Sequence, residues 1–154
     1  QSIDNLSKID LNSKISELFL QYFYNLDLNR VLFDTRVFMN LKNIIIIGHL
    51  KSIQTDLFKS MKNLRKIDIE TVDFKYFFHK IGIEWMTYLN YDLASFDYEK
   101  NDLSTISKDI SIKISMEISS FYTFLYNYKF PDQDFCIFSR FPHQKLVFIS
   151  FGVI

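Results

Sequence analysis

The stretch that decides the fold is residues 56–69, which run Asp56-Leu57-Phe58-Lys59-Ser60-Met61-Lys62-Asn63-Leu64-Arg65-Lys66-Ile67-Asp68-Ile69. Its second half has the form apolar-x-x-apolar-x-apolar, given by Leu64, Ile67 and Ile69. Ile67 and Ile69 are two positions apart, so in an extended strand both side chains point to the same face. The stretch therefore predicts a short strand that is buried on one face, with Leu64 anchoring the approach to it.

The same pattern occurs four times in the first half of the chain. The four copies are Ile15, Leu18, Leu20; Leu41, Ile44, Ile46; Leu64, Ile67, Ile69; and Met86, Leu89, Tyr91. Their starts are 22 to 26 residues apart. One copy cannot bury its apolar face alone, so we expect the copies to stack, with strands near 18–20, 44–46, 67–69 and 89–91 forming a parallel sheet.

Apolar residues also precede each predicted strand after the first. They are Val31, Leu32 and Phe38; Ile53, Phe58 and Met61; and Phe74, Phe77, Phe78 and Ile83. We expect these side chains to cover the sheet from the convex side. Residues 52–62 are expected to carry one short helical or irregular turn.

In these features residues 15–94 resemble the leucine-rich-repeat family, whose repeats are about 20–29 residues long. The resemblance implies an α/β solenoid with a short parallel sheet on its concave face and irregular or short helical convex segments. The family usually has Asn or Cys three positions after the last strand residue. This chain has Phe23, His49, Val72 and Ala94 there, so its repeats are degenerate.

The second half of the chain is less regular. Residues 97–109 are mostly polar and are expected to be a loop or a worn repeat. Ile110, Ile112, Ile114, Met116 and Ile118 then alternate with polar residues, which favours a strand, whereas the apolar spacing in 121–128 is helical and leaves a helix as the alternative. A terminal strand is expected in 146–153. We therefore divide the chain into leucine-rich repeats at 1–96 and a worn repeat followed by the start of a C-terminal cap at 97–154.

The cap follows from the family resemblance, because extracellular members commonly end in a cysteine-containing cap. Cys136 is the single cysteine, so it has no disulfide partner within the chain. The chain starts at Gln1 and ends within an apolar run, and we expect it to be a fragment whose remaining sequence supplies that partner. The alternative is a buried, inert thiol. Asn5-Leu6-Ser7 is a glycosylation sequon if the protein is secreted.

Neither catalysis nor a cofactor is predicted. His49, His79 and His143 are widely spaced, and the chain contains no zinc motif or phosphate-binding loop. Cys136 and His143 could act as nucleophile and base, but nothing identifies a third group that would orient them. Eighteen basic residues balance eighteen acidic ones, so nucleic-acid binding is not expected. No apolar run approaches the roughly 20 residues of a membrane span, so any anchor is expected outside these residues.

The predicted binding surface is the concave face of the sheet, where side chains between the inward-facing residues meet solvent. The candidate partner-binding residues are Phe19, Gln21, Tyr22, Ile45, Ile47, Asp68, Glu70, Thr71, Asn90 and Asp92. Exposed β-branched residues such as Ile45 and Ile47 are unfavourable on a free surface, which suggests that a partner covers them. Because these apolar rows lie beside an acidic row, the partner is expected to be a protein with an apolar centre and a basic rim. The alternative is that a neighbouring segment of the chain covers this face.

The sequence thus predicts a protein-recognition module that is not an enzyme. The resemblance to receptor and adhesion ectodomains implies a cell-surface or secreted protein. An intracellular leucine-rich-repeat adaptor, or the substrate-recognition subunit of a larger assembly, remains the alternative.

Overall fold

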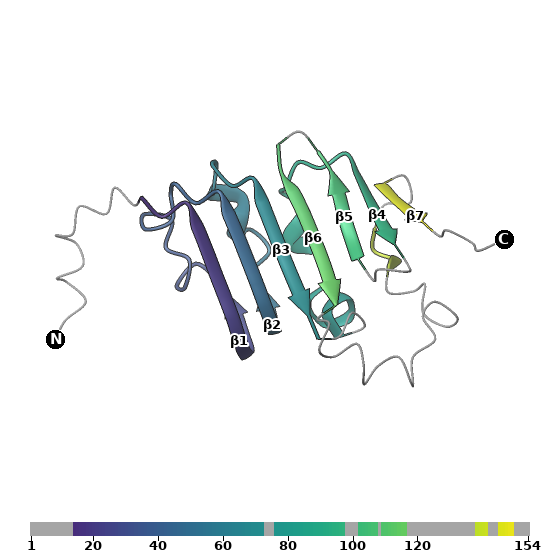
Figure 1. Ribbon diagram of the computed structural model, residues 1–154, viewed down its shortest axis with the longest axis horizontal. Coiled ribbons are helices and arrows are strands. Elements are labelled where there is room, and N and C mark those ends of the chain that lie inside the picture. The colour runs from purple at the N-terminus through teal and green to yellow at the C-terminus, as the bar shows by residue number, and fades with distance from the viewer. Residues whose placement is uncertain are drawn as a thin grey trace.

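The computed structural model describes residues 14–72, 76–97, 102–107, 109–116, 138–141 and 145–149. These residues form one seven-stranded sheet (Figure 1). Its strands are β1 (Glu17–Leu28), β2 (Asn43–Ile53), β3 (Lys66–Thr71), β4 (Leu93–Asp97), β5 (Asp102–Ile106), β6 (Ser111–Met116) and β7 (Leu146–Ile149). The helical elements are short: the 3₁₀ turns η2 (Leu57–Ser60) and η4 (Glu84–Met86), and the π-helical turn η3 (Phe77–Ile81).

The strands lie in the order β1-β2-β3-β6-β5-β4-β7. β1, β2, β3 and β6 are parallel neighbours, and β5 runs against β6 and β4 on its two sides. β7 is parallel to β4. The prediction of a parallel sheet is therefore wrong, because the sheet is mixed. The described residues have the broad α/β fold class that was predicted.

Connection length explains the change of direction. The connections 29–42 and 54–65 are long enough for the crossover that a parallel pair requires. By contrast, only residues 107–110 join β5 to β6, and so short a link permits only antiparallel pairing.

Three of the four strand positions predicted from the repeat pattern lie within β1, β2 and β3. Leu18 is paired with Ile44 and Ile44 with Ile67, and the next inward row is Leu20, Ile46 and Ile69. The four isoleucines are at most 1% exposed, whereas the two leucines of the edge strand are half-buried. Because burial of one isoleucine side chain is worth about 1.5–3 kcal/mol, these rows contribute strongly to the core.

The fourth predicted strand, 89–91, is wrong. Leu89 and Tyr91 are buried, but they precede β4, which pairs with β5 and β7 rather than with β3. β6 takes the place beside β3, and there Ile112 and Ile114 continue the inward rows of Ile67 and Ile69. The alternation in residues 111–116 thus forms the predicted strand, while the helical alternative in 121–128 lies outside the described residues.

The described parts of the connecting segments pack mainly behind the sheet in the view of Figure 1. Residues 57–60 form the short helical turn expected there, and Phe58 and Met61 are buried as predicted. Trp85 is 1% exposed and lies edge-on to Phe58, with 5.8 Å between ring centroids. The Phe138 ring lies between those of Phe78 and Phe96. The distances between ring centroids are 5.2 Å to Phe78 and 4.8 Å to Phe96.

The connection after β1 departs from the expectation. Val31 and Leu32 were expected to cover the sheet but are exposed, at 92% and 43%. The side chain of Asn29 accepts hydrogen bonds from their backbone N–H groups and so forms a tight turn. The turn points both side chains to solvent and buries Phe33 in their place.

Asp34 stabilises the next turn of this connection by pairing with Arg36, and the pKa of Asp34 provides a test of that pairing. Its carboxylate accepts hydrogen bonds from the Arg36 backbone and guanidinium, which lower its pKa from 3.8 to about 2. We expect an NMR titration to give a midpoint of about 2, and Arg36→Ala to return it towards 3.8. The stabilisation is present above pH 3.8 and is lost as the pH falls through about 2. A wild-type midpoint near 3.8 would contradict the pairing.

The division of the chain between residues 96 and 97 remains a prediction. Strands from both sides of this position share the sheet, since β4 pairs with β5. Cys136, Asn5 and His143 lie outside the described residues.

Candidate partner-binding surface

Alternating burial gives the sheet two distinct faces. In β3, Ile67 and Ile69 are buried, whereas Asp68 and Glu70, which alternate with them, are half-buried on the opposite side. β2 and β6 alternate in the same way. We call this second side the open face, because its side chains are exposed or half-buried.

Strand register arranges the open face in rows. The first row is Phe19, Ile45, Asp68, Lys113 and Ser104, and the second is Gln21, Ile47, Glu70, Ser115 and Asp102. Neighbours within a row are on adjacent strands, about 4.8 Å apart. Residues far apart in the sequence are thereby brought into a continuous surface.

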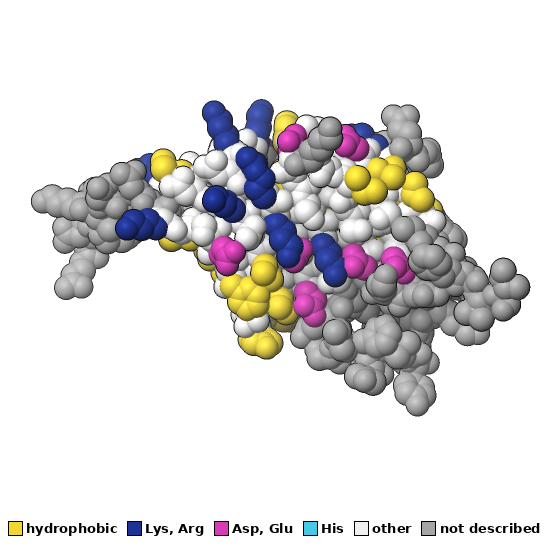
Figure 2. Space-filling model, turned by 45° about the horizontal axis from the view of Figure 1, so that its top comes forward, with side chains coloured by type: hydrophobic (Ala, Val, Ile, Leu, Met, Phe, Trp, Pro, Cys, Tyr) yellow, Lys and Arg dark blue, Asp and Glu magenta, His cyan; other side chains and the backbone are white. Residues whose placement is uncertain are grey.

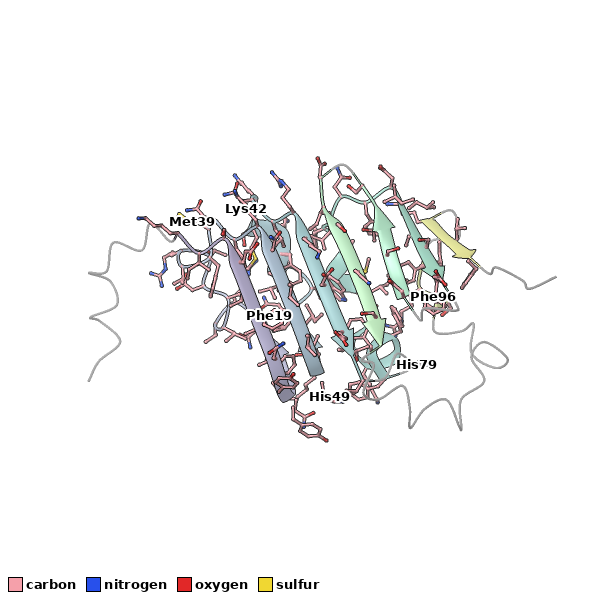
Figure 3. All side chains as sticks on the ribbon, in the orientation of Figure 1. Phe19, Met39, Lys42, His49, His79 and Phe96 are labelled. Atoms are coloured by element: carbon pink, nitrogen blue, oxygen red, sulfur yellow. The ribbon has the colours of Figure 1, made fainter. Side chains whose placement is uncertain are left out.

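The β1–β2 side of the open face is apolar. Phe19 is 52% exposed and is paired in register with Ile45, which is half-buried. Ile47 is half-buried in the next row. Figure 2 shows hydrophobic side chains gathered in patches with charged side chains beside them, and Figure 3 labels Phe19 on β1.

The middle of the open face carries ion pairs. Lys66 Nζ is 2.6 Å from Asp68 Oδ2, and Lys113 Nζ is 3.0 Å from Asp102 Oδ2. The Oδ1 atoms of both aspartates are buried and accept no hydrogen bond from another described residue. Each lysine therefore offsets the charge of its aspartate through the Oδ2 atom alone.

An aromatic stack lies at the end of β1 and β2. The His49 ring is 5.1 Å from Tyr24 and 4.5 Å from Tyr76, measured between ring centroids. Its Nδ1 atom is buried and has no hydrogen-bond partner among the described residues. This stack was not predicted from the sequence, because register shifts in β1 bring Tyr24 opposite His49 and no local pattern reveals such shifts.

Six of the predicted binding residues share the open face. They are Phe19, Gln21, Ile45, Ile47, Asp68 and Glu70. Tyr22 is 84% exposed but falls within a register shift, with φ of 56°, so it stands outside the rows.

The other predicted residues are placed elsewhere. Thr71 is only 3% exposed, because the alternation of β3 turns it inward with Ile69. Asn90 and Asp92 precede β4, where the Asn90 side chain donates to Asp109 at 3.0 Å and the Asp92 N–H donates to Ile106. They were predicted to adjoin β3, but β6 occupies that position.

Lys113, Ser115 and Asp102 join the surface instead. They were not among the candidates, because the sequence does not indicate that β6 and β5 follow β3 in the sheet. The alternation around Ile112 and Ile114 predicted which residues of β6 face outward, but not which strand they adjoin.

Comparison with known proteins gave no relative. Neither a family model, a curated protein nor a solved structure matches the chain.

The described residues contain no group of three or more His, Cys, Asp or Glu placed to hold a metal ion. Within the same ranges, no helix is long and apolar enough to cross a membrane. What the open face offers is apolar area beside carboxylate and ammonium groups, a combination suited to binding another macromolecule.

Proposed function

We propose that the protein is a recognition module built on degenerate leucine-rich repeats, and that it binds another protein through the open face of β1, β2 and β3. The observation that carries the proposal is the apolar group formed by Phe19, Ile45 and Ile47 beside charged residues on that face. An apolar centre with a polar surround is the common anatomy of protein interfaces.

Stacking contacts between successive units support the repeat interpretation. Side-chain interactions join Asn43 to Glu17, Lys51 to Asp27, Arg30 to Asp56, and Asn63 to Met39. These pairs are 24–26 residues apart, close to the spacing of the sequence pattern. Contacts between equivalent positions of neighbouring units are what a stacked repeat requires.

We further propose a cell-surface or secreted location, in line with the ectodomains that the pattern resembles. The alternative is an intracellular adaptor. The two are distinguished by the sequence of the full transcript, in which a signal peptide and a partner cysteine for Cys136 would favour the first.

Site-specific photo-crosslinking tests the binding surface. We expect a photoreactive phenylalanine at position 19, expressed in the source cells, to give a discrete adduct with one protein. Ile47→Asp is expected to abolish the adduct, because a charge would then face the apolar centre. The control site is Tyr88, which is 50% exposed but outside the rows of the open face. Equal adducts at positions 19 and 88, or no adduct at 19, would refute the proposal.

A further inference from the structure

Glu70 differs from its charged neighbours on the open face. Asp68 and Asp102 are each paired with a lysine, and Glu17 accepts a hydrogen bond from Asn43. Glu70 has no hydrogen bond or ion pair with another described residue, although its side chain is half-buried. Among the described acidic residues of the open face, Glu70 therefore carries a negative charge that no neighbouring side chain offsets.

The position of Glu70 links this charge to the apolar centre. Its register partners are Ile47 on β2 and Ser115 on β6, neither of which carries a positive charge. A partner that covers Ile47 must also cover Glu70, one strand away. Removing a carboxylate from water without a counter-charge would oppose the gain from apolar contact.

We propose that the natural protein partner presents an arginine or lysine to Glu70, next to an apolar side chain that packs against Phe19, Ile45 and Ile47. This inference rests on the proposed function and adds the chemistry of the partner. The charge of the site is complementary to a cation, and a guanidinium could pair with both carboxylate oxygens. In an extended segment, side chains two positions apart face the same side, so the two groups would be spaced i and i+2.

Selection from a random peptide library tests this inference without assuming a partner. Dodecapeptides displayed on phage would be selected on the whole chain, and the enriched peptides measured by fluorescence anisotropy. We expect the enriched sequences to carry Arg or Lys two positions from an apolar residue. Glu70→Gln, which keeps the shape and removes the charge, should weaken their binding about tenfold. High salt should weaken it in the same direction.

Two control variants separate the inference from the function on which it rests. Glu84→Gln removes the same net charge from an exposed residue of η4 and should leave binding unchanged. Ile47→Asp should abolish binding. Circular dichroism would check that each variant is folded.

The outcomes are distinguishable. Peptides that are lost with Ile47→Asp but lack basic residues, or that ignore Glu70→Gln, would overturn the cationic partner and leave the binding face intact. If the enriched peptides bind the Ile47→Asp variant as well as the wild type, or no peptide is enriched, both proposals fail.

Discussion

Replacing Trp85 with alanine is expected to lower the free energy of unfolding by about 3–5 kcal/mol. The indole is 1% exposed, and its Nε1–H donates to the Gly82 carbonyl at 3.2 Å. Truncation would leave a cavity beside Phe58 and an unsatisfied buried carbonyl. Typical domains are stable by only about 5–15 kcal/mol, so much of the variant could be unfolded at 37 °C.

Urea denaturation followed by far-ultraviolet circular dichroism measures this loss, since the variant lacks the only tryptophan. Tyr88→Ala is the matched control, because Tyr88 is an aromatic residue near η4 that is 50% exposed. We expect it to change the free energy of unfolding by about 0.5 kcal/mol or less. Similar losses of unfolding free energy in the two variants would mean that Trp85 does not anchor the connecting segments that pack against the sheet.

Gly48→Ala is expected to destabilise the pairing of β1 with β2 by about 2–4 kcal/mol. Gly48 has φ of 144°, which side-chain-bearing residues rarely adopt. An added Cβ would lie 2.8 Å from the Phe23 carbonyl oxygen and 3.2 Å from the Phe23 nitrogen. Both atoms belong to the backbone of β1, so relief of the contact requires the two strands to separate.

Gly82→Ala provides the comparison. Gly82 also has a positive φ, of 73°, but its added Cβ would meet the side-chain ends of Glu84 and Arg140, which can move away. We expect a smaller loss, about 1–3 kcal/mol, because the Gly82 backbone, with φ of 73° and ψ of −164°, adopts a conformation that residues with a side chain rarely adopt. Hydrogen exchange would locate the effect, with faster exchange in β1 for Gly48→Ala. Unchanged protection of β1 would show that the strand accommodates the methyl group.

The sequence predicted those parts of the fold that depend on local alternation. The apolar pairs of 18–20, 44–46 and 67–69 lie within strands because two side chains on one face of an extended segment create their own buried side. Strand order could not be predicted in the same way. Both the Leu89–Tyr91 pair and the Ile112–Ile114 pair could continue the inward rows, and the choice depends on long-range packing.

The candidate surface was likewise predictable where it depends on local alternation and not where it depends on long-range packing. Phe19, Ile45 and Glu70 share a face because their parity within each strand is set locally. Alternation alone could have excluded Thr71, which has the parity of the buried Ile69. The stack of Tyr24, His49 and Tyr76 was beyond prediction, because it depends on shifts in β1 and on the chain that follows β3.

The irregularity of β1 has a consequence for solubility. β1 is an edge strand of the sheet that the described residues form, and unpaired backbone groups on an edge can recruit strands of other molecules. Tyr22 and Asn25 have φ of 56° and 58°, and the register shifts around them interrupt the regular extended geometry of β1. Such bulges deprive an incoming strand of a continuous template, so they protect the protein against edge-to-edge aggregation.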